Sequence, residues 1–119
     1  MQLFNGALAN GASQVVTPAL GLPAESKALA VSVLSAYSAT AGTTGVQLQV
    51  GASLDGGATF SDYATVATTA PTPSSGVAVQ SEVYASLDAY KGATHLQFKL
   101  VNLDGTNNAT VTLTFRAAV

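Results

Sequence analysis

Residues 94–101, with the sequence THLQFKLV, alternate apolar and polar side chains, and this alternation decides the class of fold. Successive side chains of a β-strand point to opposite faces, so Leu96, Phe98 and Leu100 share one face and the polar residues share the other. The stretch TVTLTFRA at residues 110–117 repeats the pattern. Each stretch predicts a strand with one buried face. The turn-forming residues at 102–108 predict that the two strands form an antiparallel hairpin.

Other strand patterns bring the expected number of strands to about eight. Residues 46–50 predict a half-buried strand, residues 29–37 a more central one and residues 77–83 another, with weaker patterns at 3–4, 14–17 and 60–67. We therefore expect an all-β fold, a single antiparallel β-sandwich of the jelly-roll type, as one domain of residues 1–119. The apolar faces predict this core: Leu29, Val31, Val33, Leu48, Val50, Val79, Leu96, Phe98, Leu100, Leu113 and Phe115.

Helix has little room in this chain. One turn fits at residues 86–92, where Ser86 can cap its start and Gly92 its end. Loops are expected at 18–27, 38–45 and 68–76. The last of these contains Pro71 and Pro73, whose restricted backbone would lose little entropy on docking, which makes both prolines candidate contacts for a partner.

The N-terminal residues 1–12 allow two interpretations. They contain two Asn-Gly steps and few core-forming residues, so they can be a flexible arm that orders only against a partner, with Leu3 and Phe4 as apolar anchors. Alternatively, Leu3 and Phe4 begin an edge strand, which is a common way of fixing a terminus. The sequence leaves both interpretations open.

Reactive chemistry is scarce. The chain has no cysteine and no tryptophan, one histidine (His95), one arginine (Arg116), and charged residues at only 8%. Disulfides and thiolate metal sites are thereby excluded, and four basic residues cannot neutralise a nucleic-acid backbone. No secretory signal pattern and no apolar run of membrane-spanning length is present, so we expect a soluble, unprocessed protein without enzymatic activity. A surface with so little charge also favours self-association.

One local motif stands out, the sequence SLDGGATF at residues 53–60. It resembles the Asp-box, a Ser-x-Asp-x-Gly-x-Thr-aromatic hairpin of sialidase propellers, with phenylalanine in place of the usual tryptophan. The resemblance implies a structural turn and no active site, and a single arginine cannot form the arginine cluster of sialidases. The turn residues are Ser53, Asp55, Gly57, Thr59 and Phe60.

Three other kinds of chemistry have no strong support in the sequence. Five oxygen donors could serve Ca²⁺, but their spacing lacks an EF-hand pattern; they are Asp55, Asp62, Asp104, Asn107 and Asn108. His95 has no nucleophile or carboxylate near it in the sequence. The four tyrosines could stack on sugars, but they fall on four different segments; they are Tyr37, Tyr63, Tyr84 and Tyr90. We therefore expect no cofactor and no metal.

The whole chain is similar to small β-sandwich virion proteins of tailed bacteriophages. The shared features are the absence of cysteine, richness in Ala, Thr and Gly, the hairpin motif at 53–60 and the strand sequence KGATHLQFKL at 91–100. The resemblance implies a capsid decoration (cement) protein that is made in the host cytoplasm, binds the major capsid protein on the outer capsid surface, and is often a trimer. A tail or neck component, or a carbohydrate-binding or adhesive sandwich, remains an alternative.

Overall fold

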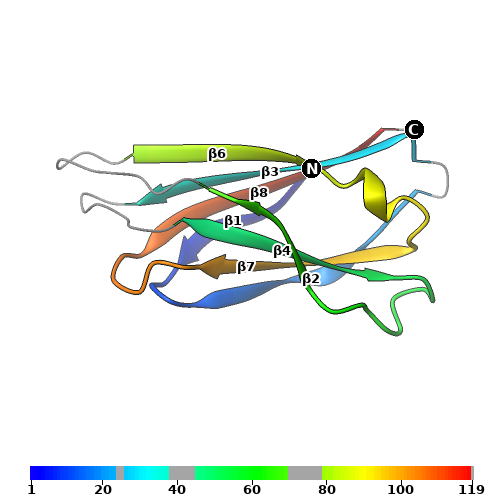
Figure 1. The fold of residues 1–119 in the computed structure, drawn as a ribbon, viewed down its shortest axis with the longest axis horizontal. Coiled ribbons are helices and arrows are strands. Elements are labelled where there is room, and N and C mark those ends of the chain that lie inside the picture. The colour runs from blue at the N-terminus through cyan, green and yellow to red at the C-terminus, as the bar shows by residue number, and fades with distance from the viewer. Residues whose placement is uncertain (24–25, 38–44, 70–78, 119) are drawn as a thin grey trace.

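The computed structural model describes residues 1–23, 26–37, 45–69 and 79–118, which form two four-stranded antiparallel sheets (Figure 1). One 3₁₀ turn, η1 (Asp88–Tyr90), joins two of the strands. The strands are β1 (Gln2–Leu8), β2 (Ser13–Gly21), β3 (Ala28–Tyr37), β4 (Val46–Ser53), β5 (Ala64–Thr68), β6 (Val79–Ser86), β7 (His95–Asn102) and β8 (Ala109–Ala118).

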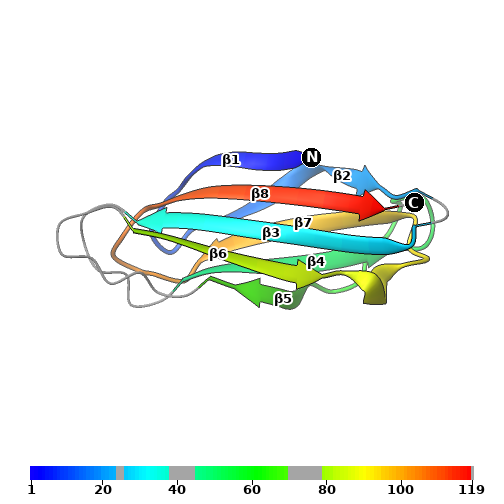
Figure 2. The same cartoon turned by 90° about the horizontal axis from the view of Figure 1, so that it is seen from above.

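The strand order is that of a jelly roll. One sheet has the order β1-β8-β3-β6 and the other β2-β7-β4-β5, so the chain wraps with β1 beside β8, β2 beside β7, β3 beside β6 and β4 beside β5. Figure 2 shows the first sheet across the front of the molecule, with β1 and β6 at its two edges. The predicted all-β sandwich of the jelly-roll type is confirmed.

The predicted hairpin between residues 94–101 and 110–117 is wrong. β7 pairs with β2 and β4, whereas β8 belongs to the opposite sheet and pairs with β3 without interruption from Ala28↔Ala118 to Tyr37↔Ala109. The connection between β7 and β8 therefore crosses from one sheet to the other. Each of these strands has one apolar face, and the two faces can pack against each other only when the strands lie in opposite sheets. The backbone hydrogen bonds that a hairpin would have supplied are made instead with distant strands.

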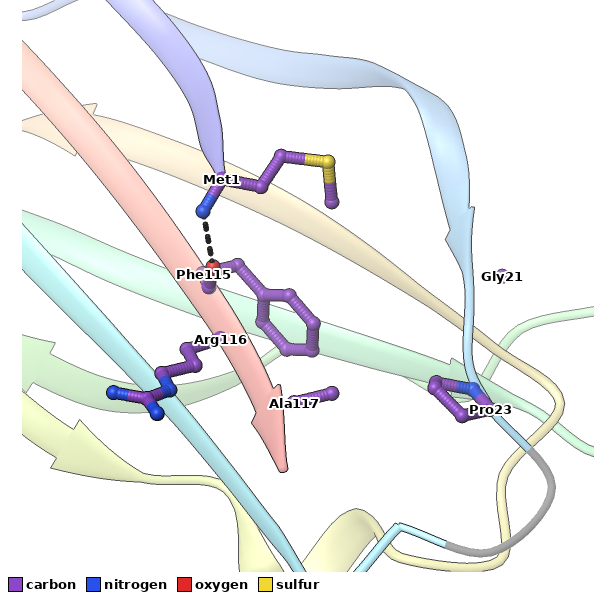
Figure 3. Close-up of a pocket in the computed structure, with 6 residues that line it drawn as sticks. All are labelled: Met1, Gly21, Pro23, Phe115, Arg116 and Ala117. Atoms are coloured by element: carbon purple, nitrogen blue, oxygen red, sulfur yellow. Dashed lines mark hydrogen bonds between the residues drawn. The ribbon is translucent and has the colours of Figure 1, made fainter. Parts of the chain in front are cut away.

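The N-terminus is an edge strand, the second of the two interpretations. β1 pairs with β8 from Gln2↔Thr114 to Leu8↔Ala109. The N-terminal ammonium group of Met1 donates a hydrogen bond to the carbonyl of Phe115 over 2.8 Å, and the Phe115 N–H donates one to the carbonyl of Met1 (Figure 3). Leu3 and Phe4 are half-buried and pack against the core.

The predicted turn at 86–92 is confirmed as a connector between β6 and β7. The N–H of Asp88 donates to the Ser86 hydroxyl over 3.2 Å, and Gly92 ends the turn at a φ of 100°, a conformation that favours glycine. The structure adds Leu87 to the core, because this residue is fully buried where the chain leaves β6.

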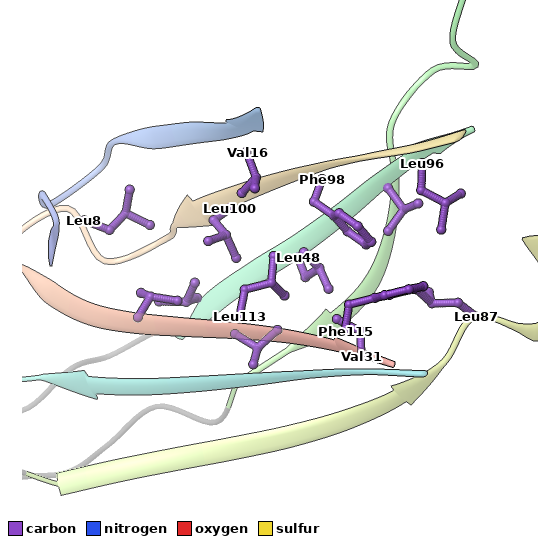
Figure 4. Close-up of a cluster of buried hydrophobic side chains, with 14 of the residues drawn as sticks. Leu8, Val16, Val31, Leu48, Leu87, Leu96, Phe98, Leu100, Leu113 and Phe115 are labelled. Carbon is purple, nitrogen blue, oxygen red and sulfur yellow. The ribbon is translucent and has the colours of Figure 1, made fainter. Parts of the chain in front are cut away.

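The core lies between the inner faces of the two sheets (Figure 4). Every predicted core residue whose side chain the structure describes is buried; Val79 lies in β6, but its side chain is outside the described set. Burying a Val, Leu or Phe side chain contributes about 1.5–3 kcal/mol, so this layer supplies the main driving force for folding. Buried residues that sequence analysis did not predict are Leu8, Val16, Tyr37, Val46, Leu87, Ala109 and Val111.

Candidate functional site

The motif at 53–60 forms a closed turn between β4 and β5. Both Oδ atoms of Asp55 accept hydrogen bonds from Thr59, one from its N–H over 3.0 Å and one from its hydroxyl. The hydroxyl of Ser53 accepts the Gly57 N–H and donates to Asp55. These bonds, led by the Thr59 hydroxyl, hold the pKa of Asp55 well below its usual range. The polar groups of the motif thus hydrogen-bond to one another within the turn, as a structural role requires.

Thr94, which precedes β7, is hydrogen-bonded to this turn. Its hydroxyl accepts the N–H of Gly56 and donates to the carbonyl of Ser53. His95 is half-buried on the outward face of β7, and its Nδ1 lies 3.2 Å from the Thr94 hydroxyl. A Cβ atom at Gly57 would lie 3.5 Å from the His95 ring, so this ring packs against the turn at 53–60.

The oxygen donors that the sequence offered for Ca²⁺ lie in two separate places, and Asp104 and Asn107 contact each other in one of them. The carboxylate of Asp104, which is buried, accepts the N–H groups of Thr106 and Asn107 and so closes the loop between β7 and β8. Asp55 lies in the turn at 53–60, and Asp62 is exposed beyond that turn. Among the residues that the structure describes, no three His, Cys, Asp or Glu side chains gather in a group that could hold a metal ion.

The four tyrosines serve different purposes. Tyr37 is 1% exposed and belongs to the core. Tyr63 is half-buried beneath Lys99, whose Nζ lies 5.6 Å from the centre of the ring, so the ammonium group covers one ring face. Tyr90 is half-buried at the end of the η1 turn, and Tyr84 is 76% exposed on β6. The described tyrosines therefore do not form a shared stacking platform.

Surface depressions are shallow. One of about 330 Å³ lies beside the N-terminus, between Met1, Pro23 and Phe115 (Figure 3). Another, of about 340 Å³, lies between Leu54 and the η1 turn. A third, of about 230 Å³, lies on the outward face of the β1-β8-β3-β6 sheet and is lined by Ala30, Val31, Ser32, Tyr84, Thr114, Phe115 and Arg116.

That outward face carries few charged side chains. Its residues alternate with the buried ones of β3 and β8, so hydroxyl and methyl groups form most of its surface. Glu82 and Arg116 are the only charged side chains on it among the described residues, and they lie near its margins. The other members with described side chains are Gln2, Asn5, Ala7, Ala28, Ala30, Ser32, Leu34, Ala36, Tyr84, Ser86, Thr110, Thr112, Thr114 and Ala118.

The four edge strands of the sandwich differ in their regularity. β1 has a register shift between Gln2 and Phe4, and β2 has one between Val16 and Leu20. β5 has only five residues and is also shifted against β4. By contrast, β6 pairs with β3 through eight residues without a shift. Bulges and short lengths protect edges from further pairing, so among the described strands β6 is the one edge strand without either protection.

Sequence reasoning singled out the turn at 53–60 but missed the position of β6 at the edge of its sheet. A strand can be recognised from its own alternation, but its place at an edge depends on which strands pair. The candidate contacts Leu3 and Phe4 lie together in β1, whereas Pro71 and Pro73 fall outside the described residues. Whether any of the four touches a partner stays a prediction.

The chain matches no family model and no curated protein. No helix among the described residues is long and apolar enough to span a membrane. The fold and its surfaces are therefore the basis for a functional assignment.

Proposed function

We propose that this protein is a non-enzymatic structural component of a virion, a capsid decoration (cement) protein that binds the outer capsid surface through the outward face of the β1-β8-β3-β6 sheet. The observation that carries the proposal is the scarcity of charge on this face. The cores of protein interfaces are depleted in charged residues, because a charge that loses water without gaining a partner costs free energy. Jelly rolls also occur in viral capsid proteins, which supports the proposal by analogy of fold.

A rigid scaffold suits this role. The face is built on two central strands, β8 and β3, which are paired along their full length, so its shape is set before a partner arrives. A preorganised surface loses little conformational entropy on docking. The major capsid protein is the proposed partner, and Leu3, Phe4, Pro71 and Pro73 stay candidate contacts beside the face.

The first test is the composition of purified virions of the virus that encodes the chain. A copy number comparable to that of the major capsid protein supports decoration. A few tens of copies would instead favour the tail or neck alternative, and complete absence would overturn both.

The second test changes the face itself. Thr112→Lys places a charge at its centre, opposite Leu34, and should abolish co-sedimentation with undecorated capsids while leaving the melting temperature nearly unchanged. Gln97→Lys, on the outward face of the other sheet, is the matched control and should bind normally. Equal binding by both variants would show that the face is not the contact.

Carbohydrate binding is the second candidate, because of the 230 Å³ depression beside Tyr84. An exposed tyrosine ring can cover the apolar face of a sugar while Ser32 and Arg116 offer hydrogen bonds. A glycan array distinguishes the two candidates. Specific binding that Tyr84→Ala removes would favour the carbohydrate alternative, whereas an array without signal would remove it.

A further inference from the structure

Among the described strands, none pairs with the open edge of β6, so the backbone of β6 presents hydrogen-bonding groups along that edge. The N–H of Leu87 donates to the carbonyl of Leu29, in the same register that pairs Ala30 with Ser86. Antiparallel strands exchange hydrogen bonds at every second residue, so the odd-numbered residues of β6 bond to β3. The N–H and C=O groups of the even-numbered residues point away from β3; these residues are Gln80, Glu82, Tyr84 and Ser86.

Two further observations indicate that this edge suits an added strand. β6 is regular over eight residues, and its described residues include neither lysine nor proline to discourage pairing. Val83 and Ala85 point toward the core side but are only half-buried, because β6 is the outermost described strand of its sheet (Figure 2). A neighbouring strand would remove more of this apolar surface from water.

We propose that β6 binds β6 of a second copy of this chain in antiparallel orientation, so that two four-stranded sheets become one eight-stranded sheet across a two-fold axis. The edge is complementary to itself, because antiparallel pairing lets the same donors and acceptors of both copies face each other. This inference concerns the isolated protein and does not depend on capsid binding.

The side chains select one register. When Val83 lies opposite Val83 of the second copy, the backbone groups of all four even-numbered residues gain partners. Glu82 then lies opposite Tyr84 of the second copy, whose hydroxyl bonds to Glu82 of its own chain and can also approach the facing carboxylate. A shift that places Glu82 opposite Glu82 brings like charges together, which destabilises a cross-strand pair. The opposite shift, with Tyr84 at the centre, leaves Gln80 without a partner.

A cysteine crosslink tests the register. The natural chain has no cysteine, so every crosslink comes from the introduced one. In the proposed register Val83 is a non-hydrogen-bonded pair on the two-fold axis, where Cα atoms lie about 4.5 Å apart, a separation that a disulfide can span. Val83→Cys should therefore form covalent dimers under mild oxidation at least tenfold faster than Ala7→Cys on the bulged edge strand β1. Equal rates for the two variants would overturn the proposal.

Charge reversal tests the pairing without a crosslink. Sedimentation of the wild type should show two copies in the particle, and Tyr84→Glu should weaken the dimer at least tenfold because it faces Glu82 of the other copy. The double variant Glu82→Lys/Tyr84→Glu should restore dimerisation, since each lysine then faces a glutamate. A wild-type protein that sediments as a monomer or a trimer would contradict the proposal, and so would a Tyr84→Glu variant that dimerises normally. A trimer would instead match the oligomer that the phage resemblance implies.

Discussion

The rings of Phe98 and Phe115 meet across the core, with centroids 6.1 Å apart and planes inclined by 55°. Phe98 comes from β7 and Phe115 from β8, so two strands that follow each other in the chain hold the two sheets together from opposite sides (Figure 4). Tilted aromatic pairs at this distance contribute about 0.5–1.5 kcal/mol beyond the area they bury.

Phe98→Ala should therefore lower the free energy of unfolding by about 3–5 kcal/mol, because it removes a buried ring and leaves a cavity. Urea denaturation followed by circular dichroism measures the loss. Gln97→Ala, the neighbouring change on the outward face, should alter stability by less than about 0.5 kcal/mol. Similar stability of the two variants would contradict this description of the core.

Gly45 should resist substitution because of a close backbone approach. A Cβ atom at this position would overlap the carbonyl oxygen of Thr69, so the two chain segments at the start of β4 could not stay together. Gly45→Ala should destabilise the fold by about 1–3 kcal/mol, as overpacking does. Gly105→Ala, where an added Cβ meets nothing, is the control. Thermal denaturation of both proteins decides the point.

Tyr37 should make the protein sensitive to alkali. Burial, together with the charge of Asp104, raises the pKa of Tyr37 from 10.0 to about 12. Between these values the tyrosine ionises in the unfolded chain but stays protonated in the folded one. The contribution of Tyr37 to the free energy of unfolding is therefore fully present below pH 10 and is lost as the pH rises to about 12. Tyr37→Phe should flatten this fall. An unchanged slope between pH 10 and 12 would exclude Tyr37 as its source.

The same Tyr37→Phe change should also lower stability at pH 7. The Tyr37 hydroxyl donates a buried hydrogen bond of 2.7 Å to Oδ1 of Asn102, which also accepts the N–H of Asp104. Because Asn102 keeps one donor, the expected loss is about 1 kcal/mol, near the net value of one hydrogen bond. Chemical denaturation measures it, and an equally stable variant would show that the bond contributes nothing.

Asp55 should contribute to stability in the opposite pH range. Hydrogen bonds from Thr59 and Ser53 lower its pKa, so its contribution is present above the ordinary carboxyl pKa of about 4 and is lost as the pH falls through the lower, folded-state value. Asp55→Asn should melt below the wild type at pH 7, and the difference should shrink in strong acid. Asp62→Asn, an exposed control, should melt like the wild type at pH 7.

Deletion of residues 1–5 should destabilise the protein even in the absence of a partner. The deletion removes the pairing of Gln2 and Phe4 with β8 and the packing of Leu3 and Phe4 on the core. The melting temperature should fall by several degrees, since about 1 kcal/mol shifts a domain of this size by roughly 4–8 °C. An unchanged melting temperature would restore the interpretation of a loosely held arm.

The sequence by itself determined the class of fold, because a strand buried on one face requires alternation along its own length, and residues 94–101 and 110–117 carry it plainly. It also determined the turn at 53–60, whose bonds join residues at most four apart, and most of the core.

Tertiary structure alone decided which strands pair. The turn-like residues 102–108 suit a hairpin as well as a crossing between sheets, and only the ladders with distant β2, β3 and β4 distinguish the two. The role of Asn102 was hidden for the same reason: it suits a turn, but its buried amide donates to the carbonyls of Leu8 and Asn107. The open edge of β6 is a property of the sheet order as well, since a strand lies at an edge only because no strand of its own chain pairs beyond it.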